Sequence, residues 1–352
     1  MAAPPLPRDP LDTPIRFPLA LEIKSNLINE LWRCNVTAVD FQLNPFRDAN
    51  YFQYFSDQVR VVQKLSGQHA IIRTFRQIVD VVDQFRAGST YGDITTALQA
   101  RLPVPNPEDS DELVADAIDL VVRLWLMVHM GRMRHGVMMG HSTLNWTNGA
   151  LAAVVESRFQ HQLALTDSVK LQRYFTARNL ERMVGVTIKW TSNIADHLRL
   201  TEDGFTVVLN IFHHATFLEY HRTCGFFPDG LIEETIRTLA LVLPEYDRPT
   251  VNWFKRYQKK LSLDAQAVHC GILNTEARQI DHFYFWHDRL VILKQFFDEA
   301  KPRTLKQWWT DDRNRVQWFW LAIAVAAITI FFTLIQCIEG GWQVYKAYHP
   351  SL

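Results

Sequence analysis

The sequence predicts a mainly α-helical fold with a small β-hairpin element and one C-terminal transmembrane helix. Apolar residues recur at helical spacing along most of the chain, and they alternate with polar residues over residues 186–190. Near the C-terminus, residues 316–338 (VQWFWLAIAVAAITIFFTLIQCI) contain no charged side chain. At ~1.5 Å per residue, a helix of this length can cross a hydrocarbon core of ~30 Å.

The alternative interpretation of residues 316–338 is a buried core helix. Core helices usually keep a polar stripe, and Gln317 is the only strongly polar side chain before the C-terminal end of this stretch. Aromatic residues that favour the headgroup level flank the stretch on both sides. These expected membrane-anchor residues are Trp318 and Trp320 at one end and Trp342 and Tyr345 at the other.

The composition is that of a folded domain joined to an anchor. Hydrophobic residues make up 48% and charged residues 21% of the 352 residues, which are globular values. The formal net charge of +0 argues against a nucleic-acid partner. The cysteines lie far apart and form no CxxC pair, so we expect reduced thiols in a cytosolic setting rather than a disulfide framework.

These patterns divide the chain into five expected segments. They are a disordered N-terminus (1–13), a helical α+β cytosolic domain (14–300), a basic, tryptophan-bearing juxtamembrane segment (301–315), the transmembrane helix (316–338) and a short C-terminal tail (339–352). The proline-rich start offers little to bury, which favours disorder.

The first half of the domain is predicted to be helical. Residues 15–55 show no clean period, but the aromatic cluster at 51–55 is expected to pack onto a helix at 69–85. Thr90 and Asp93 have capping-box spacing and open a short helix. A further helix carries the apolar stripe from Val114 to Val128. Its continuation to residue 139 is not a second span, because Arg123, Arg132 and Arg134 interrupt it, at about 2.5–3.5 kcal/mol for each central arginine.

The second half mixes helices with the predicted strands. Helices are expected at 150–159, 175–184, 192–198, 231–243 and 253–261, with the longest at 276–300. A strand at 186–190 and a hairpin around Gly204 lie among them. The order of helix, strand, helix and hairpin resembles a winged-helix unit, and an ordinary small α+β subdomain is the alternative.

The late position of the apolar stretch predicts a tail-anchored, single-pass protein. Five basic residues within 301–315 precede the stretch, against Asp311 and Asp312, and only Lys346 follows it. Since positive charge stays on the cytosolic side, we expect the domain in the cytosol and the short tail on the opposite side of an intracellular membrane. The sequons at Asn35 and Asn145 would then never meet the glycosylation machinery.

No catalytic signature or cofactor motif is found in the sequence: it holds no GxSxG, Walker loop or GxGxxG. The weak metal candidates are His213, His214, Glu219 and His221, residue types that bind zinc but without HExxH spacing. Histidines bonded to backbone are the alternative. Two further groups are candidates for metal binding or acid–base chemistry. Asp281, His282, His287 and Asp288 form the first, for which helix anchoring is the alternative. His129, His135 and His141 lie in a methionine-rich segment and form the second, for which gap-filling methionines are the alternative.

Residues 252–260 are basic and aromatic, which is typical of contact with an anionic membrane surface. The alternative is the solvated face of a domain helix.

Several runs taken together resemble a known family. They are FTARNLERMVGVTIKWTSNIADHLRL, IFHHATFLEY, FPDGLIEETIRTLALVLP, FYFWHDRLVILKQFFDEAKPRTLKQWW, DDRNRVQWFW and GGWQVYKAY. In this order they resemble a large family of filamentous-fungal single-pass membrane proteins with no assigned function, from about Phe75 onward. The resemblance implies a helical cytosolic domain followed by one late span, and it implies no activity and no site residues.

The sequence therefore leads us to expect a membrane-tethered interaction or scaffold module with the lipid bilayer and protein partners. The alternative is a metal-dependent enzyme that uses the histidines of residues 213–221.

Overall fold

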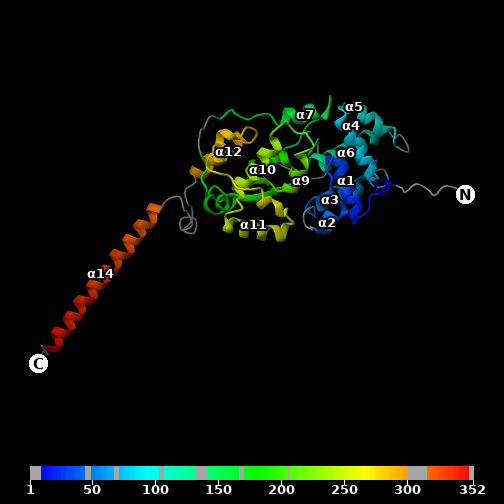
Figure 1. Ribbon diagram of the computed structural model, residues 1–352. Helices are drawn as coiled ribbons and strands as arrows, with labels where there is room; N and C mark the ends of the chain where they lie inside the picture. The colour runs from blue at the N-terminus through cyan, green and yellow to red at the C-terminus, as the bar shows by residue number, and fades with distance from the viewer. Residues whose placement is uncertain are drawn as a thin grey trace. The chain divides into compact units, whose positions relative to one another are not determined.

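The computed structural model describes residues 9–43, 49–66, 71–102, 107–131, 142–165, 170–204, 206–299 and 315–348. The chain divides into two compact units, Met1–Ala300 and Lys301–Leu352. Helices dominate the first unit, which also contains a single three-stranded sheet among its described residues, and the second unit contains one long helix (Figure 1). The predicted fold class is therefore confirmed.

The N-terminal part of the first unit is a group of helices around a long central one. The helices are α1 (Leu21–Trp32), α2 (Ala38–Leu43), α3 (Ala49–Ser66), α4 (Phe75–Arg86), α5 (Tyr91–Gln99) and α6 (Pro107–Leu126). Helices α3, α4 and α5 all contact α6 (Figure 1). The aromatic cluster lies on α3 itself, where Phe55 stacks on Phe75 of α4 with ring centroids 6.3 Å apart.

Residues 9–13, where the described chain begins, are ordered. The prediction of disorder for residues 1–13 is therefore wrong for this part. A 3₁₀ turn at Pro10–Asp12 buries Leu11. The Asp9 carboxylate caps this turn and pairs with Arg76 of α4. These contacts supply the partners that a proline-rich stretch cannot find locally. Residues 1–8 lie outside the described part of the chain.

Local capping signals set two helix starts. Thr90 and Asp93 form the predicted capping box at the start of α5, and Thr74 and Gln77 form a second one at α4. Helix α6 ends at Leu126, where Met127 takes a positive φ of 49°. Residues 124–128 are completely buried, so this stretch is a core helix end, as the interrupting arginines predict.

The sheet has the order β1-β3-β2, with β1 at Thr187–Thr191, β2 at Leu200–Asp203 and β3 at Thr206–Phe212. Strands β2 and β3 form the predicted antiparallel hairpin around Gly204. Strand β1 pairs with β3 in parallel, a long-range pairing that the local pattern does not show. The link from β1 to β2 contains a short 3₁₀ turn at Ile194–Asp196.

The remaining helices lie before and after the sheet in the chain. They are α7 (Leu151–Arg158), α8 (Ala177–Asn179) with a π-helical turn at Leu180–Val184, α9 (Ala215–His221), α10 (Leu231–Val242), α11 (Arg248–Leu261) and α12 (His287–Glu299). A 3₁₀ turn at Ala265–Val268 contacts α9, α10 and α11.

The prediction of one long helix at 276–300 is wrong. This stretch forms two 3₁₀ turns, Glu276–Arg278 and Ile280–His282, before α12 begins at His287. The buried carboxylate of Glu234 in α10 accepts the backbone N–H groups of residues 284, 285 and 286 at 2.7, 2.9 and 2.8 Å. These three N–H groups are therefore unavailable to a continuous helix.

The second unit contains α14 (Arg315–Tyr348), which continues ten residues past the predicted end at 338 (Figure 1). Within it, Leu321–Tyr348 has a mean hydropathy of 2.5 over its most apolar window, and no part of that window is buried. The helix is long and apolar enough to cross a membrane. Trp342, Tyr345 and Tyr348 lie three residues apart on it, and all three are exposed.

Candidate functional site

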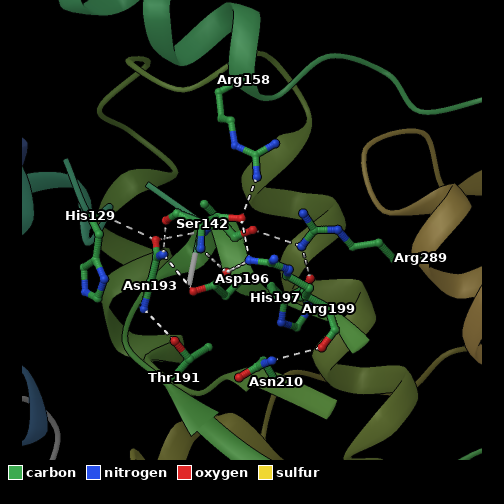
Figure 2. A network of polar contacts seen from close by, with 11 residues as sticks. His129, Ser142, Arg158, Thr191, Asn193, Asp196, His197, Arg199, Asn210 and Arg289 are labelled. Atoms are coloured by element: carbon green, nitrogen blue, oxygen red, sulfur yellow. Dashed lines mark hydrogen bonds and ion pairs between the residues drawn. The ribbon is translucent and has the colours of Figure 1, made fainter. Parts of the chain in front are cut away.

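A polar network lies beyond the end of β1, where the chain turns through residues 192–199 toward β2 (Figure 2). Asn193 starts the 3₁₀ turn because its side-chain oxygen accepts the N–H of Ala195 at 3.2 Å. The Asn193 amide nitrogen donates to the carbonyl of Ser142 at 2.8 Å and to Asp196 at 2.9 Å. The turn thereby presents a buried carboxylate to a segment that lies fifty residues earlier in the chain.

Asp196 is the central anion of this network, and its side chain is 1% exposed. One carboxylate oxygen accepts the N–H of Ser142 at 2.8 Å and Nη1 of Arg199 at 3.2 Å, and the other accepts the Asn193 amide. A buried carboxylate needs such partners to remain charged. Since both oxygens are occupied, Asp196 serves to hold the network together rather than to accept a substrate proton.

Three arginines converge on this centre from different elements (Figure 2). Arg158, the last residue of α7, donates to the hydroxyl of Ser142 at 2.9 Å, and Arg199 donates to the same hydroxyl at 3.1 Å. Arg289 of α12 donates to the carbonyl groups of Ala195, at 3.0 Å, and His197. The guanidinium of Arg289 also lies 4.9 Å from the ring centroid of Trp286.

The arginines disturb one another electrostatically. Burial, together with the positive charges of Arg158 and Arg199, lowers the pKa of Arg289 to about 10, and the charge of Asp196 acts against this shift. Burial also lowers the pKa of Arg158, where the Asp196 charge raises it and Arg199 lowers it. Three guanidinium groups therefore lie around one carboxylate among the described residues, so this region is rich in positive charge.

His197 joins the network to the core through a defined chain of hydrogen bonds. Its Nδ1 accepts the N–H of Phe212 at 3.2 Å, so Nε2 carries the proton and donates to Thr238 at 2.7 Å. The Thr238 hydroxyl in turn donates to the carbonyl of Thr235 at 2.7 Å. Burial, together with the charge of Arg289, lowers the pKa of His197 to about 3.

Each of the predicted metal-ligand candidates contacts another protein group in the structure. His213 Nδ1 accepts the N–H of Asp264 at 3.4 Å, and His221 Nε2 accepts the indole N–H of Trp32 at 2.7 Å. Glu219 is an exposed partner of Arg222 at 2.8 Å. Within the part of the chain that the structure describes, no group of three or more His, Cys, Asp or Glu residues is placed to hold a metal ion.

His214 forms a pair with Ser192, their side chains being 2.9 Å apart. A serine nucleophile needs a base that can accept its proton, with a third group to orient that base. Burial lowers the pKa of His214 well below its ordinary value, and its Nδ1 has no partner among the described residues. The geometry is therefore unfavourable for nucleophilic catalysis.

The other histidine groups are separated by the fold. Asp281 and His282 belong to the 3₁₀ turn, whereas His287 and Asp288 begin α12. Asp288 accepts the N–H groups of residues 164 and 165 at 3.3 and 3.2 Å, and with Arg289 it anchors α12, as the sequence suggested. His129 is buried three residues past the end of α6, while His135 and His141 lie outside the described residues.

Sequence reasoning did not find the arginine network. Its members come from residues 142, 158, 193–199 and 289, and each one alone is an ordinary polar residue. The network exists only because the tertiary fold brings these segments together. No family model, no curated protein and no solved structure matches this chain. The resemblance to a fungal membrane-protein family thus stays a prediction.

Proposed function

We propose that this chain is a membrane-anchored interaction protein, held in an intracellular membrane by α14, with its first unit facing the cytosol. The single observation that carries the proposal is the exposed apolar surface of α14. Its side chains include Ile330, Phe331, Phe332 and Leu334, which are 57–62% exposed. Continuous apolar surface of this kind is stable in lipid or against a partner rather than in water.

The ends of α14 support a transmembrane position. Trp318 and Trp342 are 24 positions apart in the sequence, which corresponds to about 36 Å along a helix. This distance is close to the hydrocarbon thickness of ~30 Å plus part of each interface, where tryptophan and tyrosine side chains are favoured. The bias of basic residues before the span supports a cytosolic first unit.

The surface of α11 supports a binding role for the first unit. Trp253 and Phe254 face the core, whereas Lys255, Arg256, Lys259 and Lys260 are exposed. Among the described residues, none of these four basic side chains pairs with a carboxylate. An exposed basic row on a rigid helix fits an acidic partner surface, and for a membrane-held protein the anionic leaflet is one such surface.

Two sequons provide a built-in test of the proposed orientation. Asn35 and Asn145 are both exposed, as are Thr37 and Thr147, so the folded unit offers both acceptor sites to a glycosyltransferase. The full chain expressed in eukaryotic cells should show no glycosidase-sensitive mass shift. The same chain with a cleavable signal sequence at its N-terminus is the control and should gain glycans. Glycosylation of the unmodified chain would refute the cytosolic orientation.

Substitutions in α14 test the anchor itself. Replacing Ile328 and Ile330 together by arginine places two charges near the centre of the span, at about 2.5–3.5 kcal/mol each. The double variant should become extractable with alkaline carbonate, whereas the wild type should stay in the membrane pellet. Tyr348→Arg is the matched control, because an arginine at the helix end can reach the headgroups. Extraction of wild type and double variant alike would contradict a membrane anchor.

A further inference from the structure

The charges of the network around Asp196 do not balance. Arg158, Arg199 and Arg289 face one carboxylate, an excess of two positive charges among the described residues of the network. Arg199 forms an ion pair with Asp196, with its Nη1 3.2 Å from the carboxylate. The nearby carboxylate of Asp288 is occupied by backbone N–H groups and by His287. Arg158 and Arg289 thus have no carboxylate partner within the described structure.

A neutral atom bridges two of these cations. The hydroxyl oxygen of Ser142 lies 2.9 Å from Nη2 of Arg158 and 3.1 Å from Nη1 of Arg199. The two guanidinium nitrogens therefore lie within 6.0 Å of each other, the sum of these distances. Like charges at such a separation repel, more strongly where burial removes water. An anion bound between them would relieve this repulsion.

The site is partly accessible to solvent. The side chain of Arg199 is 34% exposed, and Arg158 and Ser142 are half-buried rather than enclosed. Arg289 lies deeper, where it donates to the carbonyl groups of Ala195 and His197 and adds positive charge to the buried side of the site. Among the described residues, Arg158 donates through Nη2 and Arg199 through Nη1, so the other N–H groups of both guanidinium groups remain for a ligand, while Asp196 fixes the position of Arg199 (Figure 2).

We propose that Arg158 and Arg199, with the hydroxyl of Ser142 and the charge of Arg289 behind them, bind a phosphate group. Planar guanidinium forks match the oxygens of phosphate and carboxylate, and two of them can clamp one tetrahedral anion. The excess of two positive charges favours a phosphate dianion over a single carboxylate. The group can come from a soluble phosphate compound or from the headgroup of a phosphate monoester lipid.

The test uses the full chain in a neutral detergent. Inorganic phosphate should raise the melting temperature above that in chloride of equal ionic strength, because a ligand that binds the folded state stabilises it. Isothermal titration of the same sample gives the dissociation constant. In Arg158→Gln that constant should rise at least about tenfold. The matched control is Arg101→Gln, whose parent side chain pairs with Asp80 instead, and it should bind phosphate as the wild type does.

Two further arms keep the proposal falsifiable. If Arg158→Gln does not fold, broadening of the phosphorus resonance by the wild type measures phosphate binding directly. Short-chain phosphatidic acid and phosphatidylcholine in the same detergent distinguish the sources. Displacement of phosphate by phosphatidic acid alone assigns a lipid headgroup, and displacement by neither assigns a soluble compound. Phosphate that acts no differently from chloride, or that binds Arg158→Gln as it binds the wild type, would overturn the proposal.

Discussion

Mild acid is expected to destabilise the first unit because it buries four neutral histidines. His197, His213 and His221 are buried, and burial lowers the pKa of each from 6.5 to about 3. His214 is shifted in the same direction. Each histidine is neutral in the folded state and binds a proton in the unfolded state once the pH falls below about 6.5. The stability that these neutral histidines contribute is therefore fully present above that pH and is lost progressively as the pH falls toward 3.

The magnitude follows from proton linkage. Between pH 7.5 and 5.5, a histidine with these two pKa values loses about 1.4 kcal/mol of its contribution to the free energy of unfolding. His197, His213 and His221 together lose roughly 4 kcal/mol. Asp119 acts in the opposite sense, because burial raises its pKa to about 6. Over the same pH range its protonation adds less than about 1 kcal/mol to the free energy of unfolding. The net loss of about 3 kcal/mol is a large part of a typical stability of 5–15 kcal/mol.

Thermal unfolding followed by tryptophan fluorescence at fixed ionic strength measures this effect. The melting temperature should fall by roughly 5 °C between pH 7.5 and 5.5. In His214→Gln, the slope of the unfolding free energy against pH should decrease by the amount that corresponds to about one bound proton. His269→Gln is the matched control, because His269 is exposed on the surface beside Glu245 and is not buried in the core. A melting temperature that stays constant or rises on acidification would refute this reasoning.

Three further predictions concern particular contacts. Glu234→Gln should lower the unfolding free energy in urea by about 2–3 kcal/mol, since a neutral amide accepts the three N–H groups less strongly, and a loss below 1 kcal/mol would contradict this. In nanodiscs containing anionic lipid, Lys255 and Lys259 should be acylated at least about twofold more slowly than in neutral nanodiscs, with recovery at high salt. The exposed Lys170 is the control, and equal protection of all three lysines would argue against docking through α11. Thr90→Ala should cost about 1 kcal/mol by loss of the capping box, and an unchanged urea midpoint would count against it.

The parts of the fold that the sequence predicts correctly have local signals. Helix α6 carries one apolar stripe, α5 begins with a capping box, and α14 is a long apolar run. The hairpin around Gly204 combines alternation with a turn residue. Each of these signals lies within about twenty neighbouring residues, which is the range over which periodicity and capping act.

The parts that the sequence does not predict depend on distant partners. Helices α1 and α3 show no clean period because Trp32 and Tyr51 pack against each other and against the rest of the core, with Tyr51 donating to the carbonyl of Leu124 at 3.0 Å. The parallel pairing of β1 with β3 follows from the tertiary fold in the same way. Four separate segments form the arginine network, so its excess charge cannot be recognised in a chain whose net charge is +0.

The stretch at 276–300 shows how one distant side chain overrides a helical pattern. Continuing the helix through residues 284–286 would send their N–H groups to carbonyls four positions earlier and leave the buried Glu234 carboxylate without these donors. An unpaired buried charge costs several kcal/mol, whereas helix propensity contributes only a few tenths per residue. The chain therefore breaks where Glu234 takes three successive N–H groups, and α12 begins immediately afterwards at His287. Because Arg289 lies two residues into α12, this break also fixes the position from which it reaches the carbonyls beside Asp196.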